Sequence, residues 1–139
     1  MPAITDIRTD HYLLPLPRAL EDAMHGVMTG FDVVTARVTD SEGATGTGYT
    51  FTCGVNGGAI ADILKREMTP RVLGRDGDMI EAIWTDLWWA FHYGGRGGPT
   101  VLALSALDMA LWDLKARRAS QPLYRLLGGY DPAVPCYAG

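Results

Sequence analysis

The first third of the chain alternates between apolar and polar residues in the manner of β-strands. The alternation is regular over residues 31–39 and returns over residues 44–52, after a turn that ends in Gly43. Residues 4–16 form a third candidate strand, in which the apolar positions change phase and indicate a β-bulge. We predict a small antiparallel sheet from these three strands.

Two prolines and several glycines interrupt this pattern. Pro15 and Pro17 have no amide hydrogen to donate, so we expect them to end the first strand. Residues 18–30 have no clear periodicity and are predicted to form an irregular loop. Gly46 and Gly48 lie inside the third strand, where the absence of a side chain predicts close contact with another backbone.

From residue 59 onward the apolar positions recur every three or four residues, the period of an α-helix. Helices are predicted over residues 59–68, 79–92 and 99–118, with a short one over 123–127 before a Gly-Gly pair. The predicted fold class is therefore α+β, a three-stranded antiparallel sheet followed by a helical bundle.

Details of the predicted helices follow from single residues. Asn56 and Asp78 are expected to cap the first two helices. Thr69-Pro70 marks the end of the first helix or a kink in it. In the third helix, a stripe of small residues predicts close packing against a neighbouring helix; its members are Ala103, Ala106 and Ala110.

Composition and charge exclude several classes of protein. The 139 residues are 47% hydrophobic and 20% charged, which is typical of one globular domain with a core. With 12 basic and 16 acidic residues, the net charge of −4 disfavours binding to nucleic acid or to anionic membranes. The N-terminus has neither the basic nor the apolar region of an export signal. We expect a cytoplasmic protein with no nucleic-acid or membrane partner.

Residues with metal-binding or nucleophilic chemistry are sparse. Cys53 and Cys136 are too few for a disulfide framework or a four-cysteine zinc site. The three histidines are far apart in sequence and match no metal-binding spacing. Asp108 and Asp113 lie five positions apart on one predicted helix, so they point about 140° apart around its axis. We therefore predict no metal site and no catalytic residue within this chain.

Two motifs near the C-terminal end carry a family resemblance. An Ala-Leu-Trp-Asp run at residues 110–113 is followed by a basic helix end and by Pro-Leu-Tyr-Arg-Leu-Leu-Gly at residues 122–128. Together they closely resemble the signature of the mandelate racemase and muconate lactonizing branch of the enolase superfamily. The resemblance covers residues 3–128 and implies the N-terminal capping domain of that family. Within the family, the chain most resembles acid-sugar dehydratases such as galactarate or talarate dehydratase.

The resemblance also implies how the chain is organised. Residues 1–128 would be the capping domain, and residues 129–139 a linker and the start of the first strand of a C-terminal (β/α) barrel. In the family, Mg²⁺ binds the substrate carboxylate and a base removes the α-proton. The metal ligands and the acid/base residues lie on barrel strands that this sequence does not contain. Mg²⁺ is thus implied for the full enzyme, with no ligand here, and we expect no turnover by this chain alone.

The family's capping domain selects the substrate with two loops, which here resemble residues 18–30 and 50–58. Five residues match them, namely His25, Met28, Phe51, Thr52 and Cys53. His25 is expected to hydrogen-bond a hydroxyl or carboxylate of a polyol acid, and Phe51 and Cys53 to shape an apolar wall. The other interpretation of His25 is a solvent-exposed loop histidine.

The implied function is that of a capping domain in a Mg²⁺-dependent dehydratase or racemase. Its implied partners are a small carboxylic acid or acid sugar, the barrel of the same enzyme and further copies in a homo-oligomer. Two alternatives stay open: part of a muconate-type cycloisomerase, and a stand-alone binding or interaction domain without catalysis.

Overall fold

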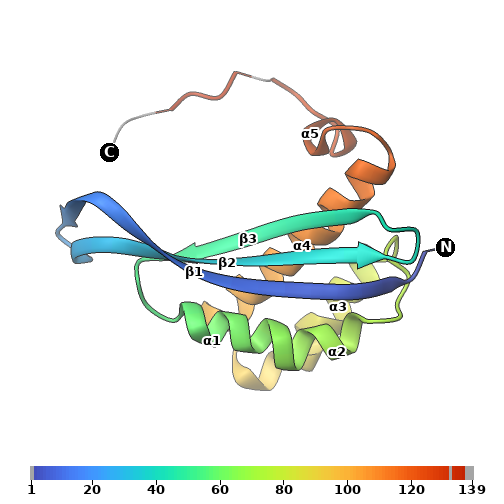
Figure 1. The fold of residues 1–139 in the computed structure, drawn as a ribbon, viewed down its shortest axis with the longest axis horizontal. Helices are drawn as coiled ribbons and strands as arrows, with labels where there is room; N and C mark the ends of the chain where they lie inside the picture. Colours follow the sequence, from blue (N-terminus) through green and yellow to red (C-terminus); the bar gives the residue numbers. More distant parts are fainter. Residues whose placement is uncertain (1, 132, 137–139) are drawn as a thin grey trace.

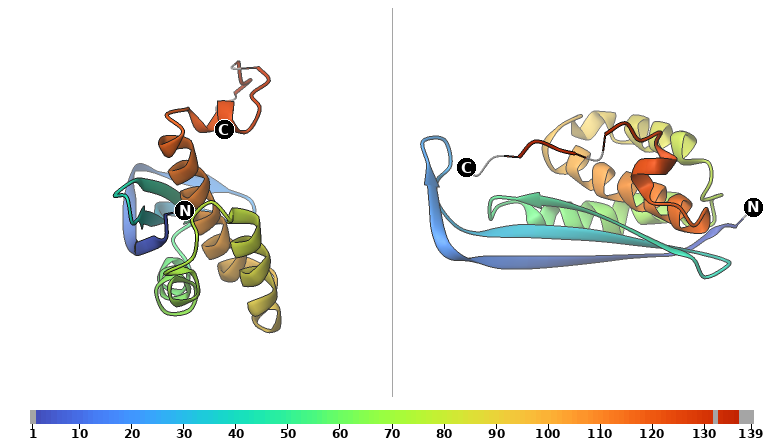
Figure 2. Two further views of the ribbon diagram at one scale, coloured as in Figure 1. Left: turned by 90° about the vertical axis from the view of Figure 1, so that its right-hand side faces the viewer. Right: turned by 90° about the horizontal axis from the view of Figure 1, so that it is seen from above.

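A three-stranded sheet and a layer of helices make up the fold in our computed structural model, which describes residues 2–131 and 133–136. Figure 1 and the left view of Figure 2 show the helices gathered on one face of the sheet. The antiparallel strands follow the chain order β1 (Ile4–Asp22), β2 (Gly26–Asp40) and β3 (Thr45–Thr52). The helices are α1 (Gly57–Asp62), η1 (Ile63–Met68), α2 (Thr69–Val72), α3 (Ile80–Ala90), η2 (His92–Gly94), α4 (Gly98–Arg118) and α5 (Leu123–Leu126). The predicted α+β class is confirmed.

The alternation in β2 explains which face of the sheet is buried. Val34, Ala36 and Val38 are buried beneath the helices, whereas the residues between them point to the other face. In β1 the register shifts between Ile4 and Asp6, so the predicted bulge is present.

The first two strands are longer than predicted and form a projecting β-hairpin in place of the expected loop over residues 18–30. The two prolines do not end β1, because the register shifts between Pro15 and Leu20 and β1 is an edge strand. Leu20 then pairs with Met28, and Asp22 with Gly26. The right view of Figure 2 shows the hairpin extending past the helices and bending away from the sheet.

The first helix also exceeds its prediction, since α1, η1 and α2 follow one another from residue 57 to residue 72. Its large buried side chains lie at every fourth position, as Ile60, Leu64, Met68 and Val72. In an α-helix that spacing would drift by about 40° per step. The π-helical η1 has wider turns that reduce this drift and keep the four side chains on one face. Pro70 therefore lies within the helical segment and does not end it.

Both predicted caps differ from the structure. Asn56 occupies the N-cap position of α1 in a left-handed conformation, with φ of 67°, but its side chain makes no capping hydrogen bond. Asp78 is not the cap of α3, because that helix begins at Ile80 and Met79 precedes it. Asp78 instead accepts a hydrogen bond from Arg118, 3.4 Å away.

Two members of the small-residue stripe of α4, Ala106 and Ala110, pack against β3, whereas the predicted partner was a helix. A Cβ atom at Gly46 would collide with the backbone of Ala110 and Leu114, and one at Gly48 with the carbonyl of Ala106. The close backbone approach predicted at both glycines is thus confirmed, although its partner is the α4 backbone. Thr47 adds a polar link, because its amide donates to the Asp113 carboxylate at 2.8 Å.

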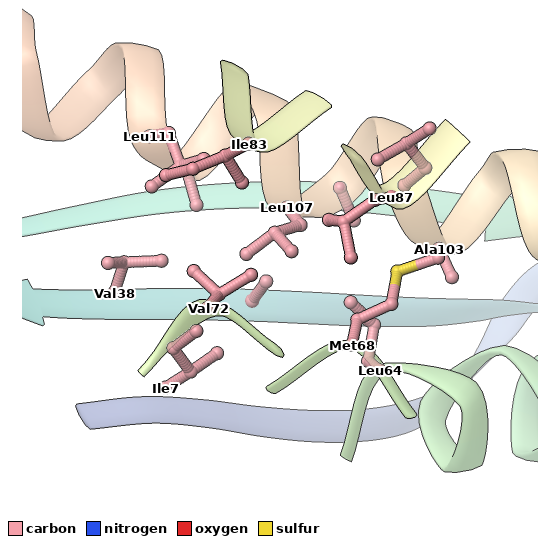
Figure 3. Close-up of a cluster of buried hydrophobic side chains, with 14 of the residues drawn as sticks. Ile7, Val38, Leu64, Met68, Val72, Ile83, Leu87, Ala103, Leu107 and Leu111 are labelled. Carbon is pink, nitrogen blue, oxygen red and sulfur yellow. The ribbon is translucent and has the colours of Figure 1, made fainter. Parts of the chain in front are cut away.

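Figure 3 shows the resulting core, where side chains from β1, β2 and all the longer helices meet. Within the described residues, we find no helix that combines the length and the apolar character needed to cross a membrane. Residues 133–136 form no strand, and Tyr137–Gly139 lie outside the described residues, so the predicted barrel strand stays a prediction.

Candidate functional site

A hollow of about 740 Å³ lies where the hairpin leaves the sheet. Its walls come from three segments that the fold brings together: the middle of β1, the start of β2 and the residues directly after β3. Met28 stands on the β2 wall, and Cys53 and Gly54 form the wall after β3. The two segments that resemble the substrate-selecting loops of the family therefore meet at one site.

Several large apolar side chains are exposed around this hollow. Leu13 and Val27, which both line it, are 68% and 64% exposed. Met24 at the hairpin tip is 89% exposed. Several large exposed apolar side chains in one region indicate a surface that meets another partner.

His25 lies at the tip of the hairpin, away from the lining of the hollow. Its Nδ1 is 2.8 Å from the Asp22 carboxylate, which also accepts the amides of His25 and Met24 at 2.6 and 2.8 Å. These hydrogen bonds, chiefly the one from the His25 amide, lower the pKa of Asp22 to about 2. The pairing holds the imidazole by Nδ1 and leaves Nε2 as its other hydrogen-bonding atom.

Phe51 and Thr52 point to opposite faces of β3. Phe51 faces away from the helices and packs edge-on against Phe31, with ring centroids 6.0 Å apart. Thr52 faces the helices and donates its hydroxyl to the carbonyl of Val55. Of the five sequence-predicted residues, only Met28 and Cys53 line the hollow, while Thr52 braces the segment that carries Cys53.

Sequence reasoning missed a part-buried hydrogen-bonded pair, His11 and Asp32, beside this hollow. The Asp32 carboxylate is 2.5 Å from His11 Nε2, and Asp32 as a whole is only 7% exposed. The sequence did contain a signal, because Asp32 shares the buried phase of β2 with Val34 and Val38. An ionisable residue in a buried phase requires a partner of opposite charge or a hydrogen bond.

The described residues do not fit a self-contained metal centre. Over residues 2–131 and 133–136, no three side chains of His, Cys, Asp or Glu gather closely enough to hold an ion. Asp113 instead pairs with Arg117 at 2.8 Å, four positions along α4.

A comparison with known protein families identifies the family of this chain. The sequence model of the N-terminal domain of mandelate racemase and muconate lactonizing enzymes matches residues 7–128. The chain belongs to this family. The family is part of the enolase superfamily, so the resemblance carried by residues 103–128 is confirmed.

A curated relative shows how much of a family member the chain represents. The chain is 51% identical over 136 residues to the 3,6-anhydro-α-L-galactonate cycloisomerase of Streptomyces coelicolor A3(2). That match covers 98% of this chain but 38% of the relative. The chain thus spans about two fifths of the length of this family member.

Two solved structures of the family share the fold closely. A racemase from Streptomyces coelicolor A3(2), solved with bound magnesium, superposes with a TM-score of 0.94 at 50% identity over 97% of this chain and 38% of that one. The L-talarate dehydratase of Polaromonas sp. JS666, solved with Mg and L-glucarate, gives 0.90 at 34% identity over 99% and 38%. The N-terminal domain is therefore shared by family members of different activities.

Proposed function

We propose that this chain is the capping part of a Mg²⁺-dependent enzyme that removes the proton α to the carboxylate of a sugar acid or related hydroxy acid. The observation that carries this proposal is the hollow walled by Met28 and Cys53, with exposed apolar residues around it. A lid that closes over a substrate needs a concave surface and apolar side chains that exclude water on closure. The similarity to enzymes with activities on sugar acids supports the same proposal.

In this proposal the chain contributes binding and exclusion of water. Met28 and Cys53 supply an apolar wall, and closure over the substrate strengthens every electrostatic interaction inside the site. His25 offers Nε2 to a substrate hydroxyl or carboxylate from the projecting tip, oriented by Asp22. Phe51 and Thr52 act indirectly, because they hold the end of β3 from which Cys53 continues.

The metal and the acid/base groups would come from outside this chain. Solved relatives contain magnesium, whereas the described residues of this chain form no cluster that suits it. We infer that the remaining three fifths of the enzyme, as judged from the relatives, form the barrel that supplies the ligands and the base. The relatives indicate two outcomes after proton removal, dehydration and cycloisomerisation.

A chimaera tests this function. The chain would replace the matching 136 residues of the Streptomyces coelicolor cycloisomerase, so that the relative's remaining chain follows it. We expect a folded enzyme that binds Mg²⁺, converts 3,6-anhydro-α-L-galactonate or another sugar acid, and loses activity when EDTA removes the metal. A folded, Mg²⁺-binding chimaera without activity on any acid that the parent converts would contradict the proposal.

Two methionines of the same hairpin provide a matched pair of variants. Met28 lines the hollow, whereas Met24 lies at the tip and does not. In the chimaera, Met28→Ala is expected to raise KM about tenfold, the effect of losing between one and two kcal/mol of apolar contact. Met24→Ala should leave KM within about twofold, because an exposed side chain loses little. If the two substitutions changed KM equally, the hollow would not be the part of this chain that binds the substrate.

A further inference from the structure

The part-buried pair of His11 and Asp32 joins β1 to β2 beside the hollow. Its shortest distance is 2.5 Å, between His11 Nε2 and Asp32 Oδ1. The Asp32 side chain is 9% exposed and the His11 side chain 33% exposed, so the carboxylate is the more buried partner. A carboxylate at this depth is retained only where a partner compensates for its lost hydration.

The two residues that flank the segment 53–56, Thr52 and Gly57, both contact this pair. At one end, Thr52 Oγ1 lies 3.5 Å from Asp32 Oδ2 and donates its proton to the carbonyl of Val55. At the other end, Gly57 packs on the pair so tightly that a Cβ atom there would lie 2.5 Å from His11 Nε2. The same Cβ would lie 2.6 Å from Asp32 Cβ. The pair therefore contacts the residues on both sides of the segment.

We propose that His11 and Asp32 are positioning residues that fix the segment 53–56 as a wall of the hollow and so determine which acids the lid accepts. Cys53 and Gly54 form that wall, opposite Met28 and its neighbours in β2. The positioning role rests only on the contacts of the pair with Thr52 and Gly57. The consequence for acid selection rests on the function proposed above.

The first experiment measures the order of the wall in the 139-residue chain. His11→Leu removes the hydrogen bond to Asp32, and the NMR order parameters of residues 53–56 should fall from about 0.85 to below about 0.6. His11→Gln keeps an amide donor near the former Nε2 position and should restore most of the order. Unchanged order parameters in His11→Leu would overturn the proposal.

A control variant separates positioning from simple loss of stability. Val38 is buried in the same strand β2 but lies far along it from the hollow. Val38→Ala should lower the unfolding midpoint in urea while leaving the order parameters of residues 53–56 unchanged. If Val38→Ala disordered the wall as much as His11→Leu at the same loss of stability, the pair would be an ordinary stabilising contact and the proposal would be wrong.

The second experiment tests the consequence in the chimaera described above. We expect His11→Leu to raise KM about tenfold for a sugar-acid substrate, to change kcat less than about threefold, and His11→Gln to restore KM. A disordered wall with an unchanged KM would overturn the selection role while leaving the positioning role intact. If the parent chimaera folds and binds Mg²⁺ but has no activity, the proposed function fails, and the order parameters still decide whether the pair positions the wall.

Discussion

Arg118, in the last turn of α4, reaches the fully buried carboxylate of Asp40 at the end of β2. Arg118 Nε lies 3.5 Å from Asp40 Oδ2, while Asp40 Oδ1 accepts the amides of Glu42 and Ala44 at 2.9 Å. The Arg118 guanidinium also approaches Asp78, at 3.4 Å. One cation thus joins the end of the long helix, the turn between β2 and β3, and the segment before α3.

Replacing this arginine is expected to destabilise the fold strongly. Arg118→Gln leaves the buried Asp40 charge without its cation, which costs about 3 kcal/mol of unfolding free energy. The neighbouring Arg117 is a matched control, because its pair with Asp113 is exposed, and Arg117→Gln should cost less than about 0.5 kcal/mol. Urea unfolding of both variants measures the difference.

Asp40→Asn in the Arg118→Gln background provides a further check. The asparagine can keep the two amide hydrogen bonds while removing the unpaired charge, so it should recover part of the lost stability. Equal stabilities of Arg118→Gln and Arg117→Gln would mean that the Asp40 carboxylate does not depend on Arg118.

Glycine at position 48 is expected to be irreplaceable. A Cβ atom there would overlap the Ala106 carbonyl and lie 2.6 Å from the Ala110 amide nitrogen, so Gly48→Ala must push α4 away from β3. We expect a loss of about 3 kcal/mol or more, measured as a shift of the urea midpoint. Gly58 in α1 is the control, because a Cβ atom there meets nothing within 4 Å. Gly58→Ala should stabilise the chain by up to about 1 kcal/mol, and a tolerated Gly48→Ala would contradict the close packing.

The sequence predicted the architecture because the hydrophobic period reports burial directly. The alternation in residues 31–39 and the stripe in residues 99–118 follow from which side chains face the core. The helix α4 appears close to its predicted bounds, whereas β2 begins five residues earlier than predicted, at Gly26. The glycines of β3 were informative for a related reason, since a missing side chain inside a strand requires a physical cause. The partner of those glycines could not be derived, because an alanine stripe fits a helix or a sheet equally well.

The hairpin and the site were harder to predict for physical reasons. Proline interrupts strand pairing only where the neighbouring strand would accept a hydrogen bond from the amide at that position. At Pro15 and Pro17 the register shift on an edge strand removes this requirement. Residues 18–30 show no regular pattern because hardly any of them is buried, so burial does not require apolar residues at regular positions there. The pair of His11 with Asp32 joins residues 21 positions apart, and only the three-dimensional register brings them together.

The hairpin tip should respond to acid in a narrow pH range. Hydrogen bonds from the His25 amide, the His25 ring and the Met24 amide lower the pKa of Asp22 from 3.8 to about 2. Because the folded pKa is the lower one, these bonds contribute fully above about pH 4 and are lost as the pH falls through about 2. Carbon-13 NMR of the Asp22 carboxyl should give this pKa directly.

The same titration should be visible at His25, and a substitution provides the control. In the parent chain, the chemical shifts of the His25 and Met24 amides should change with the Asp22 titration, since both amides donate to that carboxylate. In Asp22→Asn those shifts should be flat between about pH 4 and pH 2, because asparagine does not titrate. An Asp22 carboxyl that titrates near its ordinary value of 3.8 would show that the tip does not hold His25 through this contact in solution.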